Sequence, residues 1–571
     1  MPTLEGHFDD LQELLGRRLS PEEMDRTLDA VKGEWKQFDP GTGRFKIELN
    51  DTNRPDLWSV EGIARQLRGG RPRSGHPYGF LEQADLRKRK GGEPDIRIDS
   101  SVDRVRPFMG GFCARGGRLG AEGLLQIIGT QERLSDLFGR KRADLAIGVY
   151  PLDRIVFPLT YRACDPVTTR FVPLGADHAM TLGEIVETHP KGRAYGGLLK
   201  GHSAWPVLFD ARETILSFPP VINATSSGEV TPEDEGLFVE ATGFDPGRLL
   251  LVLNILAANL TDRGYEVEPL MAGGKSPLVA PASPGTVVHV PTGLPARVLG
   301  EERDPSDFVE TLLDFGYPQI SRPAGEGKSG WEVLSPFTRD DLLGAVDVVE
   351  DYLVAKGYDT FEPLLPREFT RGRPAPRQKI ESRIRQALTA MGYQELLSNI
   401  LTGEPLVTER LGRNAGALVR IDNPASLQFA VVRPSLLAGL LAAEARSGRA
   451  LYPHRIFEVG EAMRLGAASR GEEDRPINDL WLMSALLAHP QASVSELQGV
   501  LEMLFERMDR TLVIRTADLA PYLPGRCGTY VNRSGETVAT VGEIHPEFLD
   551  RWGIRMPTVC FEVDLEAMLA S

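Results

Sequence analysis

The chain has 571 residues, enough for about four domains of ordinary size. Hydrophobic residues make up 41% and charged residues 25%, a composition that excludes a chain disordered throughout. Because 65 Lys and Arg stand against 80 Asp and Glu, the formal net charge is −15. This charge argues against a general nucleic-acid coat protein but leaves local basic patches open.

Targeting and redox signals are sparse. Membrane helices need about 18 consecutive apolar residues, and the longest apolar run, 249–260, is broken by Asn254 and Asn259. The opening MPTLEGHFDD has neither the basic nor the apolar part of a secretory signal. The four cysteines are scattered without CxxC spacing, so we expect no disulfide framework and no cysteine zinc site. We therefore expect a cytoplasmic protein outside membranes.

The first segment, residues 1–85, begins with two expected helices within 8–38, and Pro21 stands near the start of the second. Residues 45–49 alternate between apolar and polar, as a strand does. In the loop that follows, Asp56 is the expected N-cap of a helix that ends at the paired glycines 69–70. The Gly-, Pro- and Arg-rich stretch 69–79 is typical of a linker.

Three further segments follow, and together they predict an α+β multidomain chain. Residues 93–270 alternate short strand-like and helix-like runs. Residues 271–360 open with a Pro/Gly-rich stretch and hold helical patterns near 305–315 and 343–356. Residues 362–571 contain a helical stripe over 380–391, a strand over 455–459 and a hairpin turning at Ser534-Gly535.

Four carboxylates gather at the end of the third segment: Asp341, Asp347, Glu350 and Asp351. The last three are spaced i, i+3, i+4 and share one helix face. A hard divalent cation would relieve their repulsion, and Mg²⁺ would need only one or two of them directly. The alternative is a solvated acidic face.

The stretch 204–243 has the content of a small pocket. Ser217 and Thr242 supply hydroxyls, Glu240 a carboxylate and Leu208 part of an apolar wall. Such a pocket could bind an amino acid and orient a water toward an activated ester, since positioning carries much of such catalysis. We find no Ser-His-Asp order or nucleophile elbow. The alternative is an ordinary turn-rich core.

Nucleotide and zinc motifs are missing from the sequence. There is no GxxxxGK[ST] loop, no GxGxxG after a strand and no HExxH spacing. The nearest echo of the ATP-holding arginine motif of class II synthetases is 432–436, which lacks its glycines. Basic clusters at 87–90 and 139–142 suit either phosphate contact or a solvated surface.

The order of these motifs resembles the β subunit of phenylalanyl-tRNA synthetase, in its shorter archaeal and eukaryotic-like form. The resemblance covers nearly the whole chain. It rests on NDTNRPDLWSVEGIARQLRG, LFGRKRADLAIGVYPLD, LSFPPVIN with FVEATGFD, FTRDDLLGAVDVVEDYLVAKGYDTFEP, RIRQALTAMGYQELLSNILT, NPASLQFAVVRPSLLAGLL, YPHRIFEVGEAM and GRCGTYVNRSGETVATVGEIHPEFLDRWGI, in this order.

The resemblance implies an (αβ)2 heterotetramer that charges tRNA-Phe and whose α chain binds ATP and phenylalanine. It implies an N-terminal α/β module over 1–85, an editing module over 93–270, a small helical module with Mg²⁺ over 271–360, and a degenerate class II antiparallel sheet with helices over 362–571. The editing module would hydrolyse tyrosine wrongly joined to tRNA-Phe. Its pocket falls on Leu208, Ser217, Glu240 and Thr242, and its metal ligands fall on Asp341, Asp347, Glu350 and Asp351.

The chain departs from the family pattern in four places, one of which is the loop INATSSGEV at 222–230. Glu240 stands where the family favours aspartate, and Asp351 where glutamate is common. Tyr150 and Pro151 replace the usual His-Asp pair after LAIGV. Two other readings remain beside the ligase subunit: a stand-alone trans-editing deacylase of mischarged tRNA, and a non-catalytic nucleic-acid-binding scaffold.

Overall fold

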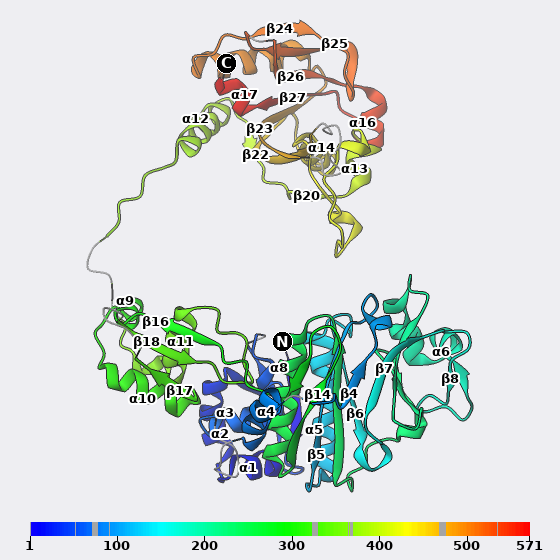
Figure 1. The fold of residues 1–571 in the computed structure, drawn as a ribbon. Helices are drawn as coiled ribbons and strands as arrows, with labels where there is room; N and C mark the ends of the chain where they lie inside the picture. The colour runs from blue at the N-terminus through cyan, green and yellow to red at the C-terminus, as the bar shows by residue number, and fades with distance from the viewer. Residues whose placement is uncertain are drawn as a thin grey trace. The chain divides into compact units, whose positions relative to one another are not determined.

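The computed structural model describes residues 2–51, 53–70, 78–90, 92–322, 329–363, 365, 369–466, 476–533 and 535–570. The chain divides into two compact units, 1–365 and 366–571 (Figure 1). Both units contain helices and sheets, which confirms a mixed α+β chain of several parts. Part of the predicted linker, 71–77, lies outside the described residues.

The N-terminal part of unit 1 is a three-stranded antiparallel sheet with helices. Its strands lie in the order β1 (Thr3–His7), β3 (Arg44–Leu49) and β2 (Gly33–Asp39). The helices are α1 (Phe8–Leu15), α2 (Pro21–Leu28) and α3 (Val60–Leu67). Pro21 is the first residue of α2, behind a capping box made by Ser20 and Glu23.

Two details of this part correct the sequence-based expectations. The second predicted helix ends at Leu28, and β2 follows because Trp35 and Phe38 pack as strand aromatics against Phe8. Asp56 does not cap a helix, since its carboxylate is held by Arg54 at 2.8 Å within a 3₁₀ turn. The N-cap of α3 is Ser59, whose Oγ accepts from Gly62 N–H at 3.0 Å.

A ten-stranded sheet forms the body of unit 1 (Figure 1). In spatial order its strands are β12 (Ile222–Asn223), β11 (Ile215–Phe218), β10 (Trp205–Phe209), β7 (Leu159–Cys164), β4 (Ile96–Ile98), β14 (Glu266–Ala272), β5 (Phe108–Arg115), β13 (Gly236–Gly243) and β6 (Leu145–Pro151), and β15 (Leu278–Ala280) pairs with β14. Neighbours are antiparallel except at β4, which runs parallel to β7 and β14. The two edges of the sheet are therefore β6 and β12.

Helix α8 (Pro246–Asp262) packs on β5 and β13 and is buried on nearly every side. Its buried Asn254 donates to the carbonyls of Ala282 and Phe337, which explains how a polar residue stands in this apolar run. The other helices near this sheet are α4 (Gly79–Lys90), α5 (Gly120–Arg133), α6 (Leu182–Thr188) and α7 (Pro190–Tyr195), and a small pair of strands, β8 (Arg170–Phe171) and β9 (Met180–Thr181), accompanies α6.

The last part of unit 1 is a small sheet with three helices around one apolar core. Its strands are ordered β16 (Val287–Val290), β18 (Trp331–Leu334) and β17 (Gln319–Ser321), and its helices are α9 (Leu294–Leu299), α10 (Pro305–Phe315) and α11 (Ala345–Lys356). The helices expected near 305–315 and 343–356 are confirmed. Asp304 caps α10 by accepting from Ser306 N–H at 2.9 Å.

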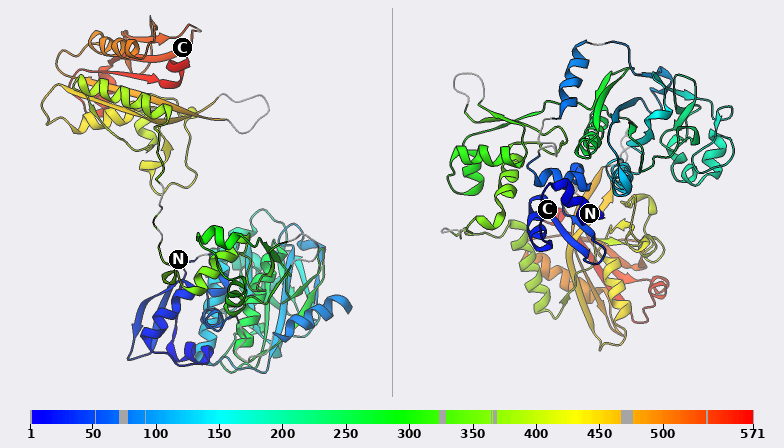
Figure 2. Two further views of the ribbon diagram at one scale, coloured as in Figure 1. Left: turned by 90° about the vertical axis from the view of Figure 1, so that its left-hand side faces the viewer. Right: turned by 90° about the horizontal axis from the view of Figure 1, so that it is seen from below.

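Unit 2 is a seven-stranded sheet with helices on both faces, drawn from two further sides in Figure 2. The strands are ordered β19 (Gln394–Glu395), β22 (His454–Leu465), β23 (Ile477–Ala488), β27 (Thr558–Asp564), β26 (Thr537–Ile544), β25 (Tyr522–Val531) and β24 (Val513–Thr516), beside the short pair β20 (Leu401–Thr402) and β21 (Val431–Val432). The helices are α12 (Pro376–Ala390), α13 (Glu404–Thr408), α14 (Leu437–Arg446), α15 (Val494–Arg507), α16 (Pro546–Trp552) and α17 (Leu565–Ala570).

Alternation along β23 separates two apolar cores in unit 2. Met483, Ala485 and Leu487 join the core that includes α12 and α15, whereas Leu486 and Ala488 join the core that includes α14 and α16. The predicted hairpin is confirmed in β25 and β26, although Ser534 of its turn lies outside the described residues. In the part of the chain that the structure describes, no helix is long and apolar enough to cross a membrane.

Candidate functional site

A cavity of about 340 Å³ lies where the two edges of the ten-stranded sheet approach each other. One wall comes from β6, and the other from β11, β12 and the turn between them. The lining residues include Gln131, Ala146, Ile147, His189, Lys191, Ser217, Phe218, Asn223 and Glu240. The candidate residues Ser217 and Glu240 therefore share one cavity, although they come from strands far apart in the sheet order.

Glu240 is the buried carboxyl group of this cavity, with 3% of its surface exposed. On β13 it stands opposite Gly148 of β6 and Gly111 of β5. Its Oε1 accepts a hydrogen bond from the Tyr150 hydroxyl at 3.1 Å. Burial raises the pKa of Glu240 to about 7, and the Tyr150 bond and the charge of Arg106 offset only part of that rise.

Two polar oxygens of the cavity residues are left open. Glu240 Oε2 and Ser217 Oγ are both buried and have no hydrogen-bond partner among the described residues. Ser217 is 2% exposed and lies close enough to Tyr150 to lower that residue's pKa, yet it makes no hydrogen bond of ordinary geometry. Because an unsatisfied buried polar atom is costly, these two oxygens are suited to a polar ligand.

The other two residues expected in this pocket do not line the cavity. Leu208 is fully buried in the apolar core beneath it, where it stands opposite Ser217 in the β10–β11 ladder. Thr242 is buried as well, and its Oγ1 accepts from Arg106 Nε at 3.0 Å. Both residues support the site from behind, and neither side chain is open to the cavity.

Sequence reasoning missed two groups of this site. The first is Tyr150, which the sequence marked only as a departure from a family pattern and not as the partner of Glu240. The second is the basic rim of Arg142, His189 and Lys191, of which the sequence marked only Arg142, within the cluster 139–142. Arg142 lines the cavity, donates to the carbonyls of Pro220 and Val221 at 3.0 and 3.1 Å, and lies over the Tyr195 ring.

The basic cluster 139–142 forms a left-handed turn just before β6. Arg140, Lys141 and Arg142 have φ values of 50°, 54° and 66°, a conformation that non-glycine residues rarely adopt. Arg140 is exposed, whereas Arg142 is partly buried at the cavity. Of the other basic cluster, Arg87 pairs with Asp95 at 2.6 Å, and the side chains of 88–90 lie outside the described residues.

The four acidic candidates line a second, smaller cavity of about 90 Å³ in unit 1. The Arg339 guanidinium lies between two of them, 2.6 Å from Asp341 Oδ2 and bonded also to Asp351. Burial alone would raise the pKa of Asp341, but the hydrogen bonds and charge of Arg339 hold that pKa below its usual value. Two of the four carboxylates are thus already neutralised within the chain.

The remaining two acidic candidates have different contacts. Asp347 Oδ2 accepts from the N–H groups of Leu343 and Gly344 at 2.8 and 2.7 Å, which caps α11. Glu350 Oε1 lies 2.7 Å from Lys32 Nζ. In the described part of the chain, no three His, Cys, Asp or Glu side chains gather as ligands of one metal ion. One oxygen each of Asp347 and Glu350 is left, a set that suits only a water-rich ion such as Mg²⁺.

The segment 432–436 of unit 2 is the nearest likeness to the ATP-holding arginine motif of class II synthetases, and its arginine is bonded to side chains and carbonyls of the same unit. Arg433 is buried and donates to Glu458 Oε1 at 2.6 Å, to Ser398 Oγ at 2.8 Å and to the Glu461 carbonyl at 2.7 Å. These bonds engage Nε and Nη1 of Arg433 within its own unit.

Comparisons with known proteins agree along the whole chain. Residues 363–565 match the family model described as the phenylalanyl tRNA synthetase beta chain CLM domain. A Borrelia garinii relative named phenylalanine–tRNA ligase beta subunit is 32% identical over 582 aligned positions, covering 100% of both chains. A relative of the same name from Thermococcus kodakarensis is 32% identical and covers 99% of this chain and 98% of its own.

A solved structure adds the same result for unit 1. The crystal structure of an N-terminal fragment of the phenylalanyl-tRNA synthetase beta subunit from Pyrococcus horikoshii covers 62% of this chain and 100% of the fragment, with 31% identity and a TM-score of 0.55. Full-length relatives above 30% identity establish the family of this chain. The chain belongs to the phenylalanine–tRNA ligase beta subunit family and is a subunit of an aminoacyl-tRNA synthetase of translation.

Proposed function

We propose that the cavity of Ser217 and Glu240 hydrolyses the ester that joins tyrosine wrongly to tRNA-Phe. The observation that supports this most directly is the pair of buried, unpartnered oxygens, Glu240 Oε2 and Ser217 Oγ, in one cavity. Tyrosine differs from phenylalanine by a single hydroxyl, and an apolar aminoacylation pocket for phenylalanine rejects this extra hydroxyl poorly. A second, hydrolytic site that hydrogen-bonds this hydroxyl supplies the missing discrimination.

The proposed hydrolysis requires no covalent step on a side chain. Water adds to the ester carbonyl and expels the ribose oxygen of the tRNA, which leaves free tyrosine and an intact tRNA. Glu240 and Ser217 hold the phenol, Leu208 and Thr242 support them from the core, and the rim of Arg142, His189 and Lys191 faces the tRNA. Positioning and exclusion of bulk water account for the rate, without a dedicated nucleophile.

The test is deacylation of Tyr-tRNA-Phe by the complex with the α chain. We expect the wild type to release tyrosine. In Glu240→Ala the rate of release should fall at least tenfold, because the carboxyl group that recognises the tyrosine hydroxyl is missing. Phenylalanine-dependent ATP–pyrophosphate exchange by the same preparations is the control, and we expect it to be unchanged. Equal release by both proteins would reject the proposal.

We also propose the assembly: an (αβ)2 heterotetramer in which the α chain holds ATP and phenylalanine. The self-paired Arg433 supports the absence of an ATP site in the described part of unit 2. Apolar side chains exposed on unit 2 support a large interface, and they include Leu397, Ile400, Leu401, Leu427, Phe429 and Leu451. Exchange activity only with α present, and sedimentation as a tetramer, would agree. A monomer in the presence of α would not.

Magnesium is a further part of the proposal. Asp347 and Glu350 would contact Mg²⁺ through their remaining oxygens, while Asp341 and Asp351 stay with Arg339. Calorimetric titration of the complex with MgCl2 tests this without any reaction. Asp347→Asn should weaken the binding, whereas the exposed, distant Asp177→Asn should not.

The finer organisation stays a proposal too. We assign 1–85 to an N-terminal module, 93–270 to the editing module, 271–360 to the small module with the acidic cluster, and 362–571 to a class II-like non-catalytic module. The four cysteines form no disulfide, which supports a cytoplasmic complex. The stand-alone deacylase and the scaffold are not favoured, since the full-length relatives carry the ligase name.

A further inference from the structure

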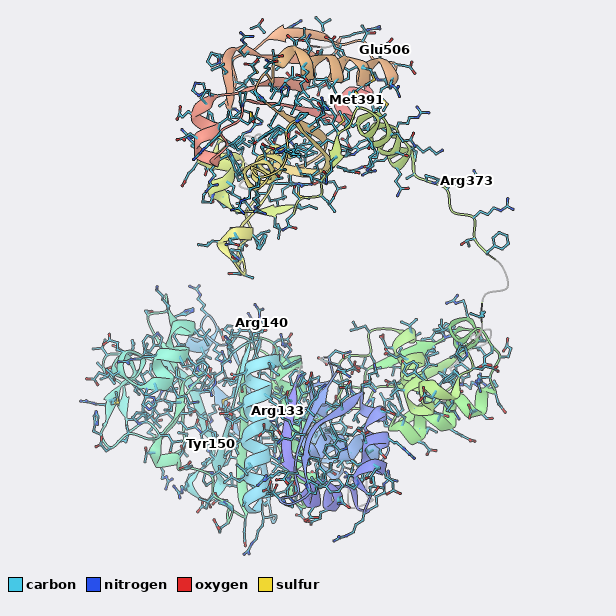
Figure 3. The ribbon with its side chains drawn as sticks, turned by 180° about the vertical axis from the view of Figure 1, so that it is seen from behind. Arg133, Arg140, Tyr150, Arg373, Met391 and Glu506 are labelled. Atoms are coloured by element: carbon cyan, nitrogen blue, oxygen red, sulfur yellow. The ribbon has the colours of Figure 1, made fainter. Side chains whose placement is uncertain are left out.

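Tyr150 contacts Glu240 without lining the cavity. It is fully buried on β6, and Figure 3 labels it. Its ring stacks on Phe238 with 5.7 Å between centroids. It is not among the residues that line the cavity. The pair fits closely, because a Cβ on Gly148 would lie 2.5 Å from Glu240 Oε1 and closer still to the Tyr150 hydroxyl. Tyr150 therefore contacts Glu240, the carboxyl group of the cavity, but does not itself line the space that a ligand would occupy.

The hydrogen bond between these residues has a fixed direction. Burial, with Glu240 adding to it, raises the pKa of Tyr150 well above its usual range, so the phenol keeps its proton and donates. Oε1 of Glu240 accepts this bond, and the proton of the neutral acid therefore belongs on Oε2. Oε2 is also the oxygen with no partner among the described residues.

We propose that Tyr150 is a positioning residue that turns Oε2 of Glu240 toward the substrate side chain and so sets the preference for tyrosyl over phenylalanyl esters. The inference rests on the proposed function and goes beyond it, because it assigns the discrimination to a residue outside the cavity. The anionic Oε2 accepts the hydrogen bond of a substrate phenol. The protonated Oε2 can no longer accept it.

The preference is consequently pH-dependent. With a Glu240 pKa of about 7, the tyrosyl preference rises as the pH increases through neutrality. Tyr150→Phe removes a bond that lowers this pKa, so the rise moves to higher pH. The other charged or titratable groups around Glu240 are Arg106, whose charge also lowers its pKa, Tyr161 in the core, and Arg142, His189 and Lys191 of the cavity.

The experiment compares deacylation of Tyr-tRNA-Phe and Phe-tRNA-Phe by the α-containing complex between about pH 5.5 and 9.5. The ratio of the two rates is used, since spontaneous hydrolysis affects both esters alike. Tyr161→Phe is the matched control, because Tyr161 is equally buried in the same core but donates to the Arg106 carbonyl at 3.1 Å. Glu240→Gln should give a flat profile.

We expect the midpoint of the wild type and of Tyr161→Phe near pH 7, and that of Tyr150→Phe higher by about one to two pH units. At pH 7 the ratio should fall by about tenfold in Tyr150→Phe. Equal midpoints for the two tyrosine variants would overturn the proposal. So would equal losses on both esters with an unchanged ratio, which is the mark of a merely structural role.

A second measurement separates this inference from the proposed function. Infrared difference titration of the complex, wild type minus Glu240→Gln, reports the ionisation of Glu240 without any ester. If no ester is hydrolysed, the proposed function fails. The positioning role is then supported by an upward shift of this titration in Tyr150→Phe but not in Tyr161→Phe, and is overturned by its absence.

Discussion

Arg65 on α3 and Asp262 at the end of α8 form a buried ion pair, 3.0 Å between Nε and Oδ2, across 197 residues of sequence. Arg68 reaches the other oxygen of the same carboxylate at 2.8 Å. This carboxylate ties the N-terminal part of unit 1 to the helix beneath the ten-stranded sheet. Removal of one partner leaves buried charges uncompensated, which costs far more than an exposed pair contributes.

Asp262→Asn should therefore destabilise the chain by about 3–5 kcal/mol. Urea unfolding followed by circular dichroism measures this loss. Glu235→Gln is the control, since its pair with Arg118 is 66% and 76% exposed and should matter little. Similar changes in the two variants would contradict the role given to Asp262.

Gly148→Ala should separate Tyr150 from Glu240, because the added Cβ would overlap both side chains. We expect the tyrosyl preference at pH 7 to fall in the direction of Tyr150→Phe, since the same hydrogen bond is lost. The rate ratio for the two esters measures this effect. Gly183→Ala is a suitable control, because the nearest atom to its Cβ is 3.5 Å away, and it should keep the wild-type ratio.

Arg339→Gln should destabilise the chain in a pH-dependent way. Arg339 lowers the pKa of Asp341, so its stabilising contribution is present above the unfolded pKa of about 4 and is lost as the pH falls through the folded pKa. The difference in unfolding free energy between wild type and variant is therefore largest near neutrality and shrinks toward acid. Denaturation midpoints from about pH 2 to about pH 8 test this sign. A difference that grows on acidification would refute it.

Arg142→Gln should raise KM for Tyr-tRNA-Phe more than it lowers kcat. The residue donates to the carbonyls of Pro220 and Val221 at the cavity rim. In the proposed function its charge faces the entering tRNA. Single-turnover deacylation over a range of enzyme concentrations separates the two parameters. Arg140→Gln, on the same turn but exposed, is the comparison. An equal effect of both would mean that only the charge of the turn matters.

Local patterns predicted much of the fold. The strand at 45–49 and the helix at 305–315 follow from periodicity, and the predicted helical stripe over 380–391 lies largely within α12, residues 376–390. The segment 33–38 was mispredicted because its strand pairing depends on β3, which comes later in the chain. Asp56 was misassigned because its partner Arg54 competes for the carboxylate that a cap requires.

The candidate site was less predictable than the fold. Ser217 and Glu240 share a cavity only because the sheet brings β6 toward β11, a long-range relationship that no local spacing reports. In the same sheet, Leu208 lies in the apolar core and Thr242 accepts a hydrogen bond from Arg106. The contact of Tyr150 with Glu240 also depends on the β6–β13 register, in which Gly148 leaves the room for it.

The cavity lies in a seam, that is, between two edges of the sheet that no strand ladder of the described residues joins. Among the described strands, β6 has a ladder partner only in β13, and β12 only in β11. Widening the seam therefore breaks side-chain bonds such as those of Arg142 and leaves the strand ladders intact. Glu240 sits on β13, which is paired on both sides. In the proposed function, the entrance can thus widen for the end of the tRNA, while Glu240 stays at a constant depth to recognise the attached amino acid.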